Sequence, residues 1–271
     1  MNTFRSQALG LAILAILGIA PIDGANAVVT QFTVVHCSDN RGCPDLGAGV
    51  TQPKIQTQTF AATSCAVQEG EISVADVPRK LLRFSSTTPN SGPGALILGD
   101  PANGPNMDFY QYALCHQHFH FKDYAEYRLW KPADYATWKS RRGDLQWKDI
   151  PSSLLIRGLA ADGVTALPVG ALNFVAGHKQ GFCAVDVTKL PQSPKSDPRT
   201  YYACGTLTTP GNQGISVGWQ DEYVFSLDGQ WIDVTNVPSG TYVLEVESNP
   251  GRLIEETNYL NDSGTIMVKI P

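Results

Sequence analysis

Hydrophobic and polar positions alternate most regularly near the end of the chain. The segments 242–247 (YVLEVE) and 266–270 (IMVKI) carry apolar side chains at every second position. A period of two is that of a β-strand, whose successive side chains point to opposite faces. The segment 231–234 (WIDV) precedes them, and Pro238-Ser239-Gly240 supplies a turn between. These segments predict antiparallel strands with one buried face.

One stretch, 132–142 (PADYATWKSRR), departs from this pattern. It begins with proline and is followed by Gly143, so it predicts a short helix that starts at Pro132 and stops before the glycine. No long stretch keeps an apolar period of 3.6 residues, and no internal repeat is present. We therefore predict an all-β fold: a single β-sandwich-like domain with long loops and one or two short helices.

The first 27 residues have the features of a secretory signal peptide. Arg5 precedes an apolar run that starts at Ala8, and Ala25 and Ala27 stand at the −3 and −1 positions of a cleavage site. An uncleaved anchor is the alternative. We expect residues 28–271 to form the exported domain, secreted or held in the periplasm or at the cell surface, with no membrane contact after cleavage. The compact leader on a short chain favours a microbial source.

The formal net charge of −5 disfavours binding to nucleic acid. All six cysteines lie beyond the leader. An even number of cysteines in an oxidising compartment predicts three disulfides, for which about 15 pairings exist.

The segment 115–120 (CHQHFH) holds three of the chain's five histidines. His116, His118 and His120 share one face only if this segment is extended, and Cys115 then points to the other face. Cys115 is therefore a poor fourth ligand and a good disulfide partner. Three imidazoles suit Cu(II), Zn(II) or Ni(II), and the residues alone leave copper and zinc open. A zinc hydrolase would also need a carboxylate base, for which Asp123 and Glu126 are candidates.

Five separated blocks carry a resemblance to a known family. They are RKLLRFSS (79–86), CHQHFH (115–120), AGHKQGFC (176–183), GISVGWQDEY (214–223) and QWIDVTNVPSGTYVLEVESNP (230–250). In this order they resemble the catalytic domain of the lysyl oxidase family. The resemblance covers roughly residues 65–125 and 172–262, and residues 131–171 form an insertion relative to animal relatives.

The resemblance implies copper bound by His116, His118 and His120. It also implies that Lys179 and Tyr223 are joined as lysine tyrosylquinone. The activity would be that of a copper-dependent amine oxidase, which uses dioxygen to convert primary amines (peptidyl lysine or alkylamines) to aldehydes, with release of ammonia and hydrogen peroxide. A general base must remove a proton from the substrate, and Asp221 is the candidate that we name, with Asp233 and Asp123 as alternatives.

Further features follow from the same resemblance. It implies disulfides Cys65–Cys115 and Cys183–Cys204, which leaves Cys37 and Cys43 as the third pair. It also implies calcium as a second metal, which suits hard oxygen ligands. The candidate ligands are Asp45, Leu46 through its carbonyl, Glu256, Asn258, Asn261 and Asp262. Trp219 and Gly229 stand where animal relatives carry further cysteines, so packing must hold the Tyr223 loop.

Two other classes of function stay open. A non-enzymatic exported β-sandwich that binds copper and calcium, as a metal carrier or an adhesion module, would keep the histidines but leave Lys179 and Tyr223 unlinked. A zinc hydrolase would hold zinc and show no quinone.

Overall fold

Antiparallel β-strands form most of the chain that the structure describes. The structure is a computed structural model and describes residues 34–144, 174–178, 181–191, 193 and 195–271. All of these residues fall in one compact unit, Phe32–Pro271. Within these ranges, no helix has both the length and the apolar character needed to cross a membrane. The predicted signal peptide and most of the insertion, from residue 145 to 171, lie outside the described residues.

The prediction of an all-β fold is confirmed. In chain order the elements are β1 (Gly49–Thr59), α1 (Cys65–Gln68), β2 (Pro78–Pro89), β3 (Leu96–Gly99), the 3₁₀ turn η1 (Met107–Phe109), β4 (Tyr110–Ala113), β5 (His118–Phe121), β6 (Ala125–Trp130), α2 (Pro132–Asp144), β7 (Phe174–His178), β8 (Thr188–Lys189), β9 (Gln213–Ile215), β10 (Trp219–Tyr223), β11 (Trp231–Asp233), β12 (Gly240–Ser248) and β13 (Ser263–Ile270).

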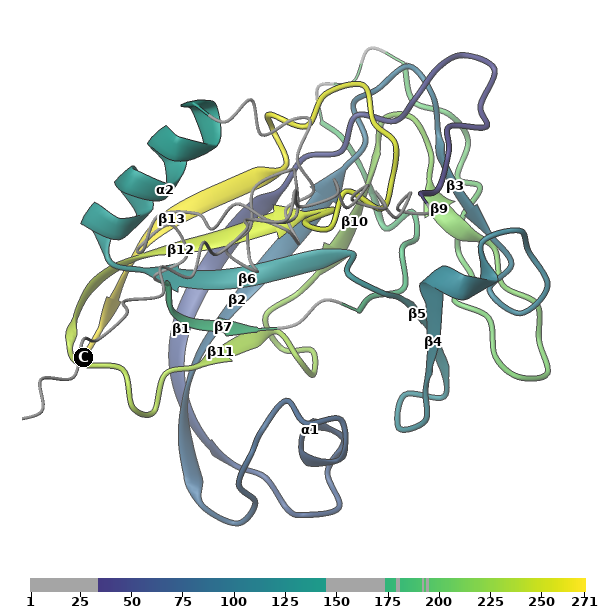
Figure 1. The fold of residues 1–271 in the computed structure, drawn as a ribbon. Coiled ribbons are helices and arrows are strands. Elements are labelled where there is room, and N and C mark those ends of the chain that lie inside the picture. Colours follow the sequence, from purple (N-terminus) through teal and green to yellow (C-terminus); the bar gives the residue numbers. More distant parts are fainter. Residues whose placement is uncertain (1–33, 145–173, 179–180, 192, 194) are drawn as a thin grey trace, which may run out of the picture. The chain divides into compact units, whose positions relative to one another are not determined.

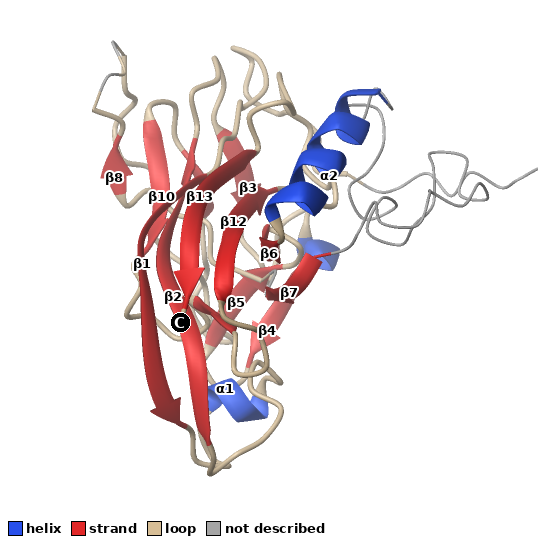
Figure 2. Cartoon of the chain, turned by 90° about the vertical axis from the view of Figure 1, so that its left-hand side faces the viewer, coloured by secondary structure: helices blue, strands red, loops and turns tan. Residues whose placement is uncertain are grey.

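Two sheets form the body of this unit (Figures 1 and 2). The first has the order β1-β2-β10-β8, with β11 paired to β2, and the second has the order β13-β12-β6-β7. Apolar side chains from both sheets form one core: Leu82 and Phe84 from β2 cluster with Tyr127 from β6 and Leu244 from β12. Phe84 and Tyr127 pack edge to face, with ring centroids 4.8 Å apart. This interdigitation of two inner faces is the packing of a β-sandwich.

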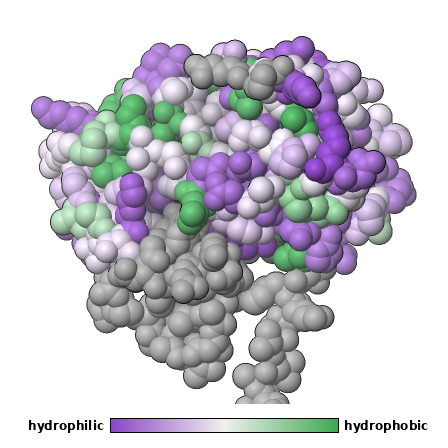
Figure 3. All heavy atoms as spheres, turned by 90° about the horizontal axis from the view of Figure 1, so that it is seen from above, coloured by the Kyte–Doolittle hydropathy of each residue, from purple (hydrophilic) through white to green (hydrophobic). Residues whose placement is uncertain are grey.

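Two smaller ribbons, β3-β9 and β4-β5, lie outside these sheets. The hairpin of β4 and β5 lies beside α1 in both ribbon views (Figures 1 and 2). On the face that Figure 3 shows, hydrophilic residues prevail and hydrophobic ones occur in small separate areas. Both ribbons also contribute apolar side chains to the core, among them Leu96 from β3 and Phe121 from β5.

The strands predicted from alternation near the end of the chain are present. β12 pairs with β13 in the register Gly240↔Ile270 to Glu247↔Ser263. β13 shows the expected alternation, with Val268 and Ile270 buried and Met267 and Lys269 exposed. The expectation of one buried face is wrong for β12, in which every residue from Tyr242 to Ser248 is buried.

The second buried face of β12 carries a cluster of charged side chains. Arg128 on β6 pairs with Glu126, with Glu247 at 2.5 Å and with Glu245 at 3.3 Å, and Trp130 Nε1 donates to Glu245 at 2.8 Å. Burial is the main cause that raises the pKa of Glu126, and the charge of Arg128 opposes it. The paired charges satisfy one another where glutamates would otherwise require water.

α2 packs against this outer face. The rings of Trp130 and Trp138 stack at 5.7 Å, and the Arg128 guanidinium lies 5.9 Å from the Trp138 ring centroid. The helix begins at Pro132 as predicted, but it continues through Gly143 to Asp144. Glycine is tolerated inside a helix at a cost of about 1 kcal/mol relative to alanine, which tertiary packing can offset.

Replacement of Arg128 by methionine tests the role of this cluster. We expect Arg128→Met to lower the free energy of unfolding at pH 7 by about 3–5 kcal/mol, because three buried carboxylates lose their cation. The loss should be smaller at pH 5, where protonation relieves the carboxylates. Urea unfolding at both pH values measures it. The control Lys269→Met, on the exposed side of β13, should change stability by less than about 0.5 kcal/mol. A loss for Arg128→Met no larger than that of the control would contradict the account.

Candidate metal centre and the adjoining tyrosine

The three histidines of CHQHFH lie on and beside the hairpin of β4 and β5. Ala113 pairs with His118, and the turn between the strands spans 114–117. The prediction of one extended segment is wrong for its first part. Gln117 has a φ of 59°, and its N–H donates to the carbonyl of Ala113 at 2.7 Å. His116 therefore lies in the turn, while His118 and His120 share a face of β5.

The turn nevertheless brings the three imidazoles together. Ring centroids lie 5.8 Å apart for His116 and His118, 5.4 Å for His116 and His120, and 4.8 Å for His118 and His120. The Nε2 atoms of His118 and His120 are 3.0 Å apart. Two nitrogens that bind one ion at about 2.0–2.1 Å lie roughly 3 Å apart when their bonds meet near a right angle. His118 and His120 therefore fit one metal ion, and the ring of His116 lies beside them.

The second nitrogen of His118 is engaged in a way that suits metal binding. His118 Nδ1 lies 3.0 Å from the carbonyl oxygen of His116. A carbonyl only accepts hydrogen bonds, so Nδ1 carries the proton and the lone pair of the neutral ring is on Nε2. A hydrogen bond at the outer nitrogen is the usual way in which proteins orient a histidine ligand.

Glu69, which the sequence analysis did not single out, provides the corresponding contact for His116. Its Oε2 lies 3.4 Å from His116 Nδ1. The Cys65–Cys115 disulfide joins the start of α1 to the residue before His116, and Glu69 follows one turn after Cys65. The signal for Glu69 in the sequence is therefore this spacing, which becomes readable only once the disulfide partner of Cys115 is known.

The segment 181–183 connects the histidines to Tyr223. Phe182 and Phe121, the last residue of β5, exchange backbone hydrogen bonds of 2.6 and 3.2 Å. A β-carbon at Gly181 would lie 3.3 Å from the β-carbon of His120, so the backbone at Gly181 approaches His120 closely. The Tyr223 hydroxyl donates to the carbonyl of Cys183 at 2.8 Å and accepts from its N–H at 2.9 Å. One short segment thus contacts both His120 and the tyrosine.

The environment of Tyr223 is apolar around the ring. Its ring packs edge to face on Phe182, with centroids 4.5 Å apart. Burial of the phenol, with a further contribution from Asp221, raises the pKa of Tyr223 well above its usual value. Lys179, the predicted partner of Tyr223, lies outside the described residues, four positions before Cys183 in the sequence. Gly181, which has no side chain, and Phe182, whose ring packs on Tyr223, stand between Lys179 and Cys183 in the sequence.

The candidate bases differ in their surroundings. Asp221 lies on the same side of β10 as Tyr223 and is 1% exposed. Burial raises the pKa of Asp221 well above its usual value, while the Glu222 N–H donates to its carboxyl at 3.0 Å. Asp233 is instead bound by Arg79 at 2.6 Å, and Asp123 lies in a turn with a φ of 53°. Glu126, considered as the base of a zinc hydrolase, belongs to the buried cluster around Arg128.

A polar cleft of about 580 Å³ adjoins the histidines. His120 and Gly181 lie on its wall, together with Glu69 and Glu71 from the segment after α1 and Lys122, which follows β5. A cleft of this size accommodates a small molecule or a peptide side chain. Its two carboxylates favour a cation over an anion.

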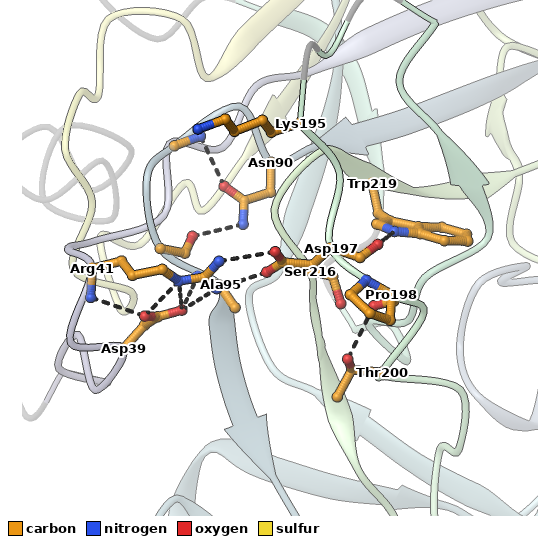
Figure 4. A network of polar contacts seen from close by, with 12 residues as sticks. Asp39, Arg41, Asn90, Ala95, Lys195, Asp197, Pro198, Thr200, Ser216 and Trp219 are labelled. Atoms are coloured by element: carbon orange, nitrogen blue, oxygen red, sulfur yellow. Dashed lines mark hydrogen bonds and ion pairs between the residues drawn. The ribbon is translucent and has the colours of Figure 1, made fainter.

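The strand that carries Tyr223 is held at its other end by ionic contacts (Figure 4). The Arg41 guanidinium lies between the carboxylates of Asp39 and Asp197, at 2.6 Å from each, and Trp219 Nε1 donates to the Asp197 carbonyl at 2.8 Å. Trp219 is the first residue of β10. Gly229, the other position that lacks a cysteine, has a φ of 77°. Ion pairs and a hydrogen bond therefore hold the start of the strand that carries Tyr223.

The structure contains three disulfides, Cys37–Cys43, Cys65–Cys115 and Cys183–Cys204. The last two are the pairs that the family resemblance implies, and Cys37–Cys43 is the pair that it leaves. The second holds α1 to the histidine turn, and the third anchors the segment 181–183. Two of the three disulfides therefore restrain the surroundings of the candidate metal centre.

The candidate calcium ligands also come together, from two distant parts of the chain. The Leu46 N–H donates to Glu256 at 2.7 Å, and the side chain of Asn261 donates to Asp45 at 2.9 Å and accepts from Asn258 at 2.6 Å. Asp262 is bound to a guanidinium instead, that of Arg252, at 2.5 Å. The oxygen donors fit a calcium ion, and Asp262 is the one candidate ligand that already has a cationic partner among the described residues.

Sequence comparisons relate this chain to known proteins. Residues 167–270 match the sequence model of the family described as Lysyl oxidase. The chain is 26% identical to lysyl oxidase homolog 2 of Rattus norvegicus over 89% of its length, and 28% identical to lysyl oxidase homolog 1 of Homo sapiens over 83%. It spans only 29% and 33% of the length of these relatives. The matches confirm the resemblance to the lysyl oxidase family.

The contact between Glu69 and His116 generates a prediction about metal affinity. We expect Glu69→Gln to lower the affinity for Cu(II) by about 10- to 100-fold, because His116 loses the carboxylate that orients it. Competition with a chromophoric chelator measures the affinity. The matched control is Glu222→Gln on β10, whose carboxylate contacts Thr188, and it should leave copper binding unchanged. Equal affinities of the two variants would contradict the role of Glu69.

Proposed function

We propose that this chain, a relative of the lysyl oxidases, is an exported copper-dependent amine oxidase. It would oxidise primary amines, either peptidyl lysine or alkylamines, to aldehydes with dioxygen, releasing ammonia and hydrogen peroxide. One observation carries the proposal: the segment 181–183 contacts both His120 and the Tyr223 hydroxyl. The sequence puts Lys179 two residues before this segment.

The residues that would hold copper are His116, His118 and His120, oriented by Glu69 and by the backbone. When bound, copper would supply the oxidation with dioxygen that converts the Tyr223 ring to a quinone joined to Lys179, and this quinone would supply the electron sink that amine oxidation needs. A set of imidazole ligands suits copper(II).

The protein's own groups would position the tyrosine and its substrate. Phe182 and the backbone of Cys183 fix the ring and the hydroxyl of Tyr223, and the Gln230 side chain donates to the Tyr223 carbonyl at 2.9 Å. The cleft beside His120 would admit the amine, and Glu69 and Glu71 on its wall favour an ammonium group. Closely held reactants are a large part of enzymatic rate enhancement.

Asp221 is the residue that we propose as proton acceptor. It lies next to Tyr223 on the inner side of β10, and burial raises its pKa above the usual value of an aspartate. A carboxyl group with a raised pKa holds a transferred proton better at neutral pH than an ordinary aspartate.

Calcium would be a second metal. It would be held by Asp45, the carbonyl of Leu46, Glu256, Asn258, Asn261 and Asp262. The signal peptide at 1–27 would direct export.

Variants of the two cross-linking residues test the activity. Tyr223→Phe and Lys179→Arg should fold and bind copper, yet release no peroxide from an alkylamine or a lysine peptide, because neither can form the quinone. Tyr202→Phe and Lys189→Arg are matched controls at exposed positions and should keep the wild-type rate. A coupled peroxidase assay measures turnover. Peroxide release from Tyr223→Phe at the wild-type rate would sink the proposal; copper binding without turnover in the wild type would favour the metal carrier.

The buried carboxyl of Asp221 generates a prediction about pH. Since its folded pKa is raised, the neutral form stabilises the protein fully below the unfolded pKa of about 3.9, and this stability is lost as the pH rises through the folded value. Asparagine resembles the neutral form. We therefore expect the Tm of Asp221→Asn, relative to wild type, to increase steadily from pH 4 to pH 8. The same variant should lose amine turnover at every pH while retaining copper. A Tm difference that does not vary with pH would contradict the assignment of a raised pKa.

A further inference from the structure

A buried arginine lies within the candidate calcium cluster. Arg252 is 7% exposed, and its Nη1 lies 2.5 Å from Asp262 Oδ2 and donates to the Tyr259 carbonyl at 3.4 Å. Its guanidinium also covers the Tyr259 ring, 4.5 Å from the centroid. Three kinds of contact therefore fix one positive charge among residues that would otherwise bind a cation.

The backbone is shaped to deliver this side chain. Arg252 has a φ of 54° and Asn249 a φ of 47°, and the Arg252 N–H donates to the Asn249 carbonyl at 3.0 Å. Arginine in the left-handed region is uncommon because its β-carbon is crowded there. The turn 249–252 holds Arg252 in this unfavourable conformation, and the side chain contacts Asp262.

The charges of the cluster explain what the guanidinium does. Glu256 and Asp262 are both buried. A buried carboxylate requires a cation or hydrogen-bond donors. Arg252 supplies one positive charge directly to Asp262, and Glu256 is satisfied by the donors from Asn249 and Leu46.

The other candidate calcium ligands also bind one another without an ion. Leu46 is bound to Glu256, and Asp45 is bound to Asn261, so the segment 45–46 is already joined to the segment 256–262. A calcium ion that takes the Asp262 carboxylate must displace the guanidinium or share the oxygen with it. Because the two cations repel each other at this distance, calcium and Arg252 compete for Asp262.

We propose that Arg252 is a built-in cation of this cluster, which keeps the two ends of the domain joined without calcium and makes calcium binding weak. The inference rests on the calcium site of the proposed function. It is independent of the amine oxidation itself, because none of its residues belongs to the copper site or to the cleft. Weak sites of this kind bind calcium with a Kd on the order of 10⁻⁴–10⁻³ M.

The test compares the full-length wild type with Arg252→Gln and Arg252→Lys. Calcium is titrated calorimetrically into each protein, and the Tm is measured in EDTA and in millimolar calcium. We expect the wild type to bind weakly and to keep nearly the same Tm in both buffers. Arg252→Gln should bind calcium at least about tenfold more tightly, lose Tm in EDTA and recover it in calcium. Arg252→Lys keeps the charge and should resemble the wild type.

The wild-type measurement alone decides the matter if Arg252→Gln does not fold. A wild type that binds calcium tightly and loses much of its Tm in EDTA overturns the proposal. So does an Arg252→Gln variant with unchanged or weaker affinity, or one whose lost stability calcium does not restore. If neither protein binds calcium, the calcium site and this inference fall together. Amine turnover, assayed on the same samples, reports separately on the proposed oxidase function.

Discussion

The two hydrogen bonds between the Tyr223 hydroxyl and the backbone of Cys183 are the contact on which the candidate site depends. They join β10, in the first sheet, to the segment that runs beside β5 and its histidines. Both backbone groups of Cys183 are used, so the hydroxyl has a single well-defined place. The disulfide from Cys183 to Cys204 fixes the same residue from its other side. The segment 181–183 therefore contacts both Tyr223 and the strand that carries His118 and His120.

The supports on the outer side of the site follow the same principle. The Cys65–Cys115 bond fixes Glu69 against His116, and the ion pairs of Arg41 fix Trp219 at the start of β10. The histidine turn is therefore held by a disulfide and by the contact with Glu69. The strand β10 is held by the ion pairs of Arg41 and by the hydrogen bond of Trp219. The bond that we propose between Lys179 and Tyr223 would need this precision, because small displacements reduce reaction rates strongly.

Local pattern predicted the strands and the class of fold, but not everything around the site. Alternation predicts β12 and β13 because a period of two is a property of the strand itself. It cannot show that Glu245 and Glu247 are buried, since that depends on Arg128, which is more than a hundred residues away in the sequence.

The prediction of an extended segment over the histidines is wrong for a similar reason. Nothing in the sequence indicates that Gln117 adopts a positive φ, which places His116 in a turn. The three rings lie close together all the same, because a turn at His116 brings its ring near those of His118 and His120, as an extended strand would also do. Glu69 and Arg252 were missed because each acts through a tertiary contact.

The central claim is that Lys179 and Tyr223 react with each other beside copper. The most direct measurement is peptide mapping of the copper-loaded protein by mass spectrometry after labelling with phenylhydrazine. The account predicts a labelled, cross-linked species that contains the peptides spanning 176–183 and 214–223. Recovery of both peptides unlinked and unlabelled from fully copper-loaded protein would contradict it.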